Sequence, residues 1–172
     1  MKIILGTAQF LNNYGSTNNS FLSKKECFKI LDLALKNNIT NFDTAMDYNS
    51  EKILGEFIKI NKLEKKVRIH TKIGNLRLIK NKAKIENLIQ ISLNKLRAKI
   101  FTLFIHNVND FEFFFKNKDF FNYMKKKYSI KNFGFSIYKF SEYKKITKKV
   151  KNCTYQVPAN IASTDFNNII VD

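Results

Sequence analysis

Residues 42–55 read FDTAMDYNSEKILG. A strand-like apolar run, residues 39–42, ends where this stretch begins, and Asp43 and Tyr48 follow it. Ser50 is placed to cap the next helix, because hydroxyl residues are favoured at the N-cap and apolar residues recur behind it at helical spacing. The stretch therefore predicts a strand, a short loop with two reactive side chains, and a helix.

The same order of strand and helix repeats along the chain. Ser23 and Glu26, for instance, have the spacing of a capping box at the start of the first helix. Strands that alternate with helices imply parallel βαβ units with right-handed crossovers, which makes this an α/β protein of about six units. The predicted strands are residues 3–5, 39–42, 67–70, 101–105, 132–135 and 154–157.

Length and composition favour one globular domain over residues 1–172. The apolar fraction of 44% and the aromatic fraction of 14% exclude a disordered chain. No apolar stretch approaches the roughly 20 residues that cross a bilayer. The opening MKIILG has too short an apolar run for a signal peptide. We therefore expect a cytoplasmic protein with no membrane partner.

The formal net charge of +17 raises the question of a nucleic-acid partner. Nucleic-acid binders gather positive charge on one face, whereas the lysines here are scattered from end to end. This distribution favours solvated surface charge and no specific nucleic acid. A nucleic-acid-binding module is an alternative, and it predicts steeply salt-dependent binding.

The cysteines and histidines do not indicate a metal site. Cys27 and Cys153 are far apart and neither lies in a C-x-x-C pair, so we interpret both as reduced packing residues. His70 and His106 show no ligand-like spacing with either cysteine. We expect no bound metal, and we expect His70 to be structural.

Four reactive side chains stand at or just past the carboxyl ends of predicted strands: Asp43, Tyr48, Lys72 and His106. In barrels of alternating strands and helices, active sites are built on that rim. The set suits carbonyl reduction, in which the carbonyl oxygen needs a proton. A phenol has a pKa of about 10, which the Lys72 ammonium would lower. Asp43 would orient Lys72, and His106 would donate a hydrogen bond or share proton transfer.

Taken one at a time, these residues have simpler interpretations. Asp43 could be a helix or turn cap, Tyr48 a packing residue of the rim, and Lys72 a surface lysine. His106 ends a buried apolar run and needs a polar partner there in any case. All four together on adjacent strand ends therefore indicate chemistry more strongly than any one of them does alone.

Several motifs of the chain resemble those of the aldo-keto reductase family. Residues 42–55 are similar to the family signature, in the pattern F-D-T-A-x-x-Y-x-S-E-x-x-L-G. The resemblance covers essentially the whole chain, including an opening similar to that of bacterial members. The further matches are Leu5-Gly6-Thr7-Ala8-Gln9-Phe10, Thr71-Lys72, Leu103-Phe104-Ile105-His106 and Gly134-Phe135-Ser136.

The resemblance implies a (β/α)8 TIM barrel, incomplete here at about six of its eight units. It also implies NADP-dependent reduction, by NADPH, of the carbonyl of a small-molecule aldehyde, ketone or sugar. Carried over position by position, Tyr48 is the general acid, Lys72 and Asp43 tune it, and His106 orients the substrate.

The cofactor contacts that the resemblance implies come from two groups of residues. Ser136 and Gln156 would hydrogen-bond the nicotinamide carboxamide, and Gly6, Thr7 and Ala8 would line the floor of the site. Two positions depart from the family pattern. Ile137 stands where the family usually has Asn, and Asn49 stands where it usually has Gly; Asn tolerates left-handed backbone geometry.

The length of 172 residues is short for a complete barrel, which needs roughly 250. The family binds the cofactor's phosphates mainly through its last two strands and the helices after them, which have no counterpart among the strands predicted here. The two open sheet edges would also permit self-association. A truncated, catalytically inactive remnant that binds a partner is therefore the alternative function. A barrel completed by another chain is the alternative architecture.

Overall fold

The computed structural model describes residues 3–10, 22–151, 153–158 and 166. Its centre is a 6-stranded sheet in which each strand pairs in parallel with the next along the chain. The predicted strands are confirmed, with bounds that differ by a few residues. They are β1 (Ile4–Gly6), β2 (Asn41–Asp43), β3 (Arg68–Ile73), β4 (Ile100–Ile105), β5 (Asn132–Ser136) and β6 (Thr154–Gln156).

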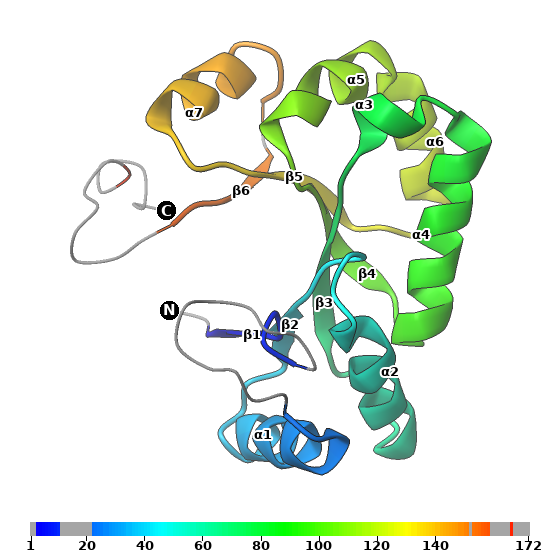
Figure 1. The fold of residues 1–172 in the computed structure, drawn as a ribbon, viewed down its shortest axis with the longest axis vertical. Helices are drawn as coiled ribbons and strands as arrows, with labels where there is room; N and C mark the ends of the chain where they lie inside the picture. The colour runs from blue at the N-terminus through cyan, green and yellow to red at the C-terminus, as the bar shows by residue number, and fades with distance from the viewer. Residues whose placement is uncertain (1–2, 11–21, 152, 159–165, 167–172) are drawn as a thin grey trace.

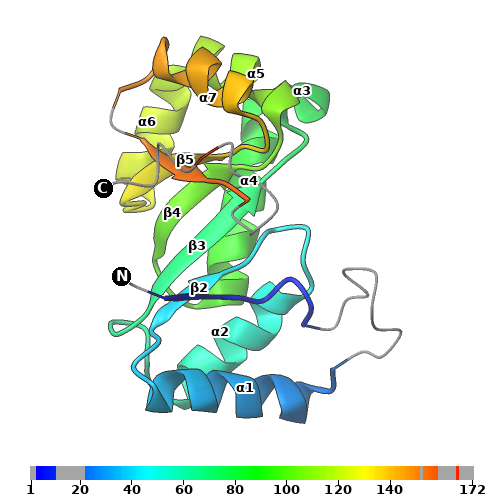
Figure 2. The ribbon, with the colours of Figure 1, turned by 90° about the vertical axis from the view of Figure 1, so that its left-hand side faces the viewer.

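Helices connect these strands and cover the outer side of a curled sheet. They are α1 (Lys24–Lys36), α2 (Ser50–Ile60), α3 (Leu76–Ile79), α4 (Lys82–Leu96), the 3₁₀ turn η1 (Val108–Asp110), α5 (Phe111–Lys116), α6 (Lys118–Lys127) and α7 (Phe140–Thr147). In Figure 1 they run from α1 at the bottom, around α2 and α4 on the right, to α5 and α7 at the top. Figure 2 shows the strands in front of α2 and α4. The result is a curled half-barrel, which confirms the predicted incomplete (β/α)8 architecture.

The core lies between the sheet and the helices. β4 is buried at every position except the half-buried Phe101, as expected for a strand covered on both faces. From the helical side, α2 buries Leu54 and Phe57 completely. The Phe111 ring of α5 packs on Phe135 of β5, with 5.0 Å between ring centres. These contacts fix the strands, and with them the positions of their carboxyl ends.

The starts of two helices test the capping predictions. Ser23 caps α1, and its reciprocal hydrogen bonds with Glu26 form the predicted capping box. The prediction that Ser50 caps α2 is wrong, because Asn49 occupies the N-cap position and Ser50 is the first helical residue. Ser50 is buried, so its hydroxyl finds an interior partner instead, the Thr7 hydroxyl at 3.0 Å.

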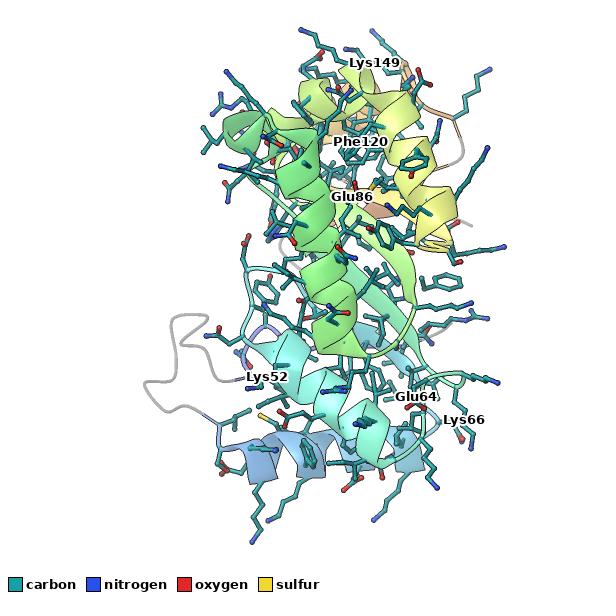
Figure 3. All side chains as sticks on the ribbon, turned by 90° about the vertical axis from the view of Figure 1, so that its right-hand side faces the viewer. Lys52, Glu64, Lys66, Glu86, Phe120 and Lys149 are labelled. Atoms are coloured by element: carbon teal, nitrogen blue, oxygen red, sulfur yellow. The ribbon has the colours of Figure 1, made fainter. Side chains whose placement is uncertain are left out.

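Lysine side chains project from many places on the helical side of the molecule (Figure 3). The labelled Lys52 on α2, Lys66 before β3 and Lys149 after α7 lie far apart in that view. Some are paired: Lys149 donates to Glu112 at 2.7 Å. The positive charge of this side is therefore spread, as the sequence indicates. No helix in the described part of the chain is both long and apolar enough to cross a membrane.

Candidate active site

The carboxyl ends of the parallel strands bring the predicted residues to one rim. Asp43 is the last residue of β2, Lys72 the last but one of β3, and His106 directly follows β4. Backbone hydrogen bonds continue past the strand ends. The Met46 amide donates to the Lys72 carbonyl at 3.0 Å, and the His106 amide donates to the last carbonyl of β3 at 2.9 Å. The β2–α2 loop, which carries Tyr48, is thereby fixed against β3.

Lys72 is a buried lysine, with 3% of its surface exposed. Its ammonium donates to Oδ2 of Asp43 at 2.5 Å and to the backbone carbonyl of Thr44 at 2.9 Å. Burial lowers the pKa of the Lys72 ammonium, and the Asp43 carboxylate opposes that shift. The alternative interpretation of Lys72 as a surface lysine is therefore wrong.

Tyr48 and His106 complete the group. The Lys72 nitrogen lies 5.5 Å from the centre of the Tyr48 ring. The His106 ring stands edge-on to that of Tyr48, with 6.1 Å between centres. Burial, and then the Lys72 charge, lower the pKa of His106 below its ordinary 6.5, although nearby aspartates oppose the shift. The imidazole is therefore neutral at neutral pH, with one ring N–H to donate.

The four side chains border a hollow of about 260 Å³, here named the inner cleft. Of the residues expected to contact a cofactor, Ala8, Ser136 and Gln156 also line it, whereas Gly6 and Thr7 are not among its lining residues. Thr7 is buried, and its hydroxyl donates to the backbone carbonyl at the end of β2 at 2.9 Å. The structure thus brings all four predicted catalytic residues, and three of the five predicted cofactor residues, to one cleft.

The side chain of Gln156 gives the inner cleft a hydrogen-bond acceptor that is not paired with a donor among the described residues. Its Oε1 is buried and has no hydrogen-bond partner among the described residues. Ser136, its register partner on β5, is 5% exposed and lines the same cleft. Because buried polar atoms are normally hydrogen-bonded, this end of the cleft suits a ligand that brings an amide N–H.

A second hollow of about 410 Å³, here named the outer cleft, shares His106 and Tyr138 with the inner one. Sequence reasoning missed both Asp47 and Tyr138. An acidic residue directly before the reactive phenol was a usable signal for Asp47, whereas nothing in the sequence marks Tyr138. The lining residues are Asp47, Gly74, Asn75, His106, Asn107, Val108 and Tyr138.

Other candidate positions lie apart from these clefts. His70 is buried, packs 5.5 Å from the Phe101 ring, and has a pKa lowered by burial. Cys27 and Cys153 both carry free thiols. Within the described ranges no group of His, Cys, Asp or Glu is arranged to hold a metal ion. A larger hollow of about 750 Å³ opens near the amino ends of β3 and β4, and none of the predicted site residues lines it.

Glu51, in the first turn of α2, ties the Tyr48 loop to β3 and α4. Its side chain is 1% exposed. Oε1 accepts hydrogen bonds from Thr71 Oγ1 at 2.8 Å and from Ser92 Oγ at 2.6 Å. Burial raises the pKa of the carboxyl above its ordinary value of 4.5, although these two hydrogen bonds oppose the shift. The folded chain therefore holds this proton more tightly than the unfolded chain does.

Glu51→Gln is expected to remove a pH dependence of stability. Between pH 4.5 and the raised pKa, the folded state binds more protons than the unfolded state, so the free energy of unfolding falls as pH rises. Glutamine cannot titrate, so the variant should lack this loss of stability. Its free energy of unfolding relative to that of the wild type should therefore increase from about pH 5 to about pH 8. Urea denaturation at both pH values measures this. A difference in stability that stays constant with pH would contradict the assignment.

The chain matches a known protein family in sequence and solved structures in fold. A model of the Aldo/keto reductase family matches residues 2–172, and no protein of curated function matches the chain. A solved structure from Pseudomonas aeruginosa, assigned to the aldo-keto reductases, is 19% identical with a TM-score of 0.75. That match covers 96% of this chain and 66% of the other.

Two further solved structures show the same likeness of fold. An aldo-keto reductase from Klebsiella pneumoniae in complex with NADPH is 17% identical with a TM-score of 0.74, over 96% of this chain and 57% of the other. The holo form of one from Bacillus halodurans is 20% identical with a TM-score of 0.69, over 92% and 53%. This chain thus spans about two thirds or less of the length of these structures.

Proposed function

This chain belongs to the aldo/keto reductase family, and we propose that it is an NADP-dependent oxidoreductase that reduces the carbonyl of an aldehyde, a ketone or a sugar. One observation carries the proposal. The Lys72 ammonium is paired with Asp43 and lies 5.5 Å from the centre of the Tyr48 ring, at the carboxyl ends of parallel strands. A buried ammonium beside a phenol is suited to make that phenol a proton donor.

Tyr48 acts as the general acid in this proposal. When the carbonyl carbon is reduced, negative charge grows on the oxygen, and the phenol proton neutralises it. The Lys72 charge favours the phenolate and so strengthens the acid. Asp43 and the carbonyl of Thr44 hold that charge in place, because both accept hydrogen bonds from the Lys72 nitrogen.

His106 positions the substrate. It borders both clefts, so a carbonyl group at their junction would lie beside it and beside Tyr48. Its lowered pKa leaves the imidazole uncharged at neutral pH. A neutral ring can donate one hydrogen bond to the carbonyl oxygen while Tyr48 gives up the proton.

The lining of the inner cleft fits the nicotinamide end of NADPH. A carboxamide offers N–H donors and one carbonyl acceptor. Gln156 Oε1 would accept a hydrogen bond from the carboxamide N–H, and the Ser136 hydroxyl would donate one to the carboxamide oxygen. Ala8 lines the cleft with a small side chain. Gly6 and Thr7 remain proposed neighbours of the cofactor. When bound, NADPH supplies the hydride, which protein side chains cannot.

Mixing the purified protein with NADPH and a panel of aldehydes tests this function. We expect aldehyde-dependent loss of NADPH absorbance, and calorimetry should detect NADPH binding when no aldehyde is present. A protein that is folded by circular dichroism but neither binds nor consumes NADPH would refute the proposal. That outcome would favour the alternative of a partner-binding protein without catalysis.

A further inference from the structure

The outer cleft carries one feature that carbonyl reduction alone does not explain, the carboxylate of Asp47. Its side chain is 59% exposed, and Oδ2 lies 3.9 Å from Nδ1 of His106. It therefore stands beside the imidazole that we place against the carbonyl group, on the side away from the inner cleft. A substrate whose carbonyl group meets His106 can therefore extend into the outer cleft past this carboxylate.

Asp47 faces this cleft without a cationic neighbour in its lining. Among the described residues that line the outer cleft there is no lysine or arginine. His106 does not neutralise the carboxylate at neutral pH, because its imidazole is uncharged there. Lys72, the nearest cation of the site, lines only the inner cleft and is paired with Asp43. The outer cleft is thus a locally negative region on a chain of net charge +17.

Gly74 keeps the space beside Asp47 open. A Cβ atom at this position would lie 3.6 Å from Oδ2 of Asp47 and 3.6 Å from Cβ of His106. Because Gly74 lines the outer cleft, a larger side chain there would take up space beside these two residues, and glycine leaves that space open. Asn75, Asn107 and Tyr138 add polar groups to the same wall.

We propose that the outer cleft is the subsite for the remainder of the substrate, and that Asp47 makes it select carbonyl compounds bearing hydroxyl or cationic groups over anionic ones. The inference rests on the proposed function, because it takes His106 as the residue that meets the carbonyl group. A carboxylate accepts hydrogen bonds from hydroxyl and ammonium groups and repels carboxylates and phosphates. The lysines elsewhere attract anions, but salt screens charges beyond about 8 Å at physiological ionic strength, so the local charge decides.

Three para-substituted benzaldehydes of similar shape test the charge preference without relying on turnover. Trimethylammonium and tert-butyl substituents are nearly isosteric and differ in charge, and a carboxylate substituent supplies the anion. NMR titration of the full chain gives a Kd for each probe. We expect the cation to bind about tenfold more tightly than the anion, a difference of about 1.4 kcal/mol. The neutral probe should lie between them.

Asp47→Asn should bring the ratio of the cation and anion Kd values towards one. Asp32→Asn is the matched control, because it removes the same charge from an exposed position on α1 and should leave the ratio unchanged. An unchanged ratio in Asp47→Asn, or no binding of any probe, would overturn the inference. Binding and consumption of NADPH are measured separately: a charge preference that depends on Asp47, in a protein that neither binds nor consumes NADPH, would uphold the subsite and refute the proposed function.

Discussion

Tyr48→Phe is expected to lower kcat/KM for every carbonyl substrate by a factor of about 10² to 10⁴. The change removes only the hydroxyl that we assign as the proton donor. The ring remains to pack beside Lys72 and His106. The hydrogen bonds of Lys72 go to Asp43 and to the carbonyl of Thr44, so the charged pair does not depend on the phenol.

Measurement of this effect needs the binding and chemical steps separated. Calorimetry should give the same NADPH affinity for Tyr48→Phe as for the wild type, and thermal unfolding should show little change. Tyr123→Phe is the matched control, because it removes a phenol hydroxyl from an exposed position on α6 and should retain full turnover. Turnover that survives in Tyr48→Phe would reject Tyr48 as the acid while leaving the fold assignment untouched.

β4 was readily predictable because it is a largely apolar run with Lys99 before it and His106 after it. Residues 101–105 became β4 with one residue added at its start. The helices were harder to predict. α3 has only four residues, too few for a full apolar repeat. The apolar residues from Phe111 to Met124 belong to two helices, α5 and α6, which separate at Asn117. The spacing of apolar residues indicates which face of a helix is buried. It does not reveal a break between two helices when both bury the same face.

The rim residues were predictable for a similar reason, since parallel strands end on the same side. The environment of each side chain was not. Nothing local in the sequence says that Lys72 is 3% exposed; its ammonium contacts Asp43 and Thr44, 29 and 28 positions earlier in the chain. Ser50 likewise looked like a cap, but it is buried against Thr7, 43 positions earlier in the chain. Contacts between distant segments decide such cases, and one sequence does not encode them in any readable pattern.

Gly55 shows how a residue can be prominent in a sequence motif for a reason that only the structure reveals. It lies in the middle of α2, where that helix crosses α4. A Cβ atom at this position would lie 1.8 Å from the carbonyl oxygen of Lys95 and 2.9 Å from the carbonyl carbon of Leu96. Both are backbone atoms in the last turn of α4, so no side-chain rotation can relieve the overlap.

Gly55→Ala is therefore expected to destabilise the fold by more than the 1–3 kcal/mol that is usual for an overpacked core, roughly 3 kcal/mol or more. Helix propensity acts the other way, because alanine is about 1 kcal/mol better than glycine inside a helix. A loss of stability on Gly55→Ala would therefore indicate that the backbones of α2 and α4 are in contact at this position, and a gain would indicate that they are not. If α4 moves away to relieve the overlap, the hydrogen bond from the Ser92 hydroxyl on α4 to Glu51 should also be weakened.

Urea denaturation measures the stability of Gly55→Ala, and Gly6→Ala is the matched control because it makes the same chemical change at another position. A Cβ atom at Gly6 meets no described atom within 4 Å, so that variant should stay within about 0.5 kcal/mol of the wild type. If Gly55→Ala is unfolded in the absence of urea while Gly6→Ala folds normally, the close crossing of α2 and α4 is supported. If Gly55→Ala is as stable as the wild type or more so, α2 and α4 are farther apart at Gly55, and the hydrogen bond from Ser92 on α4 to Glu51 on α2 would have to be placed differently too.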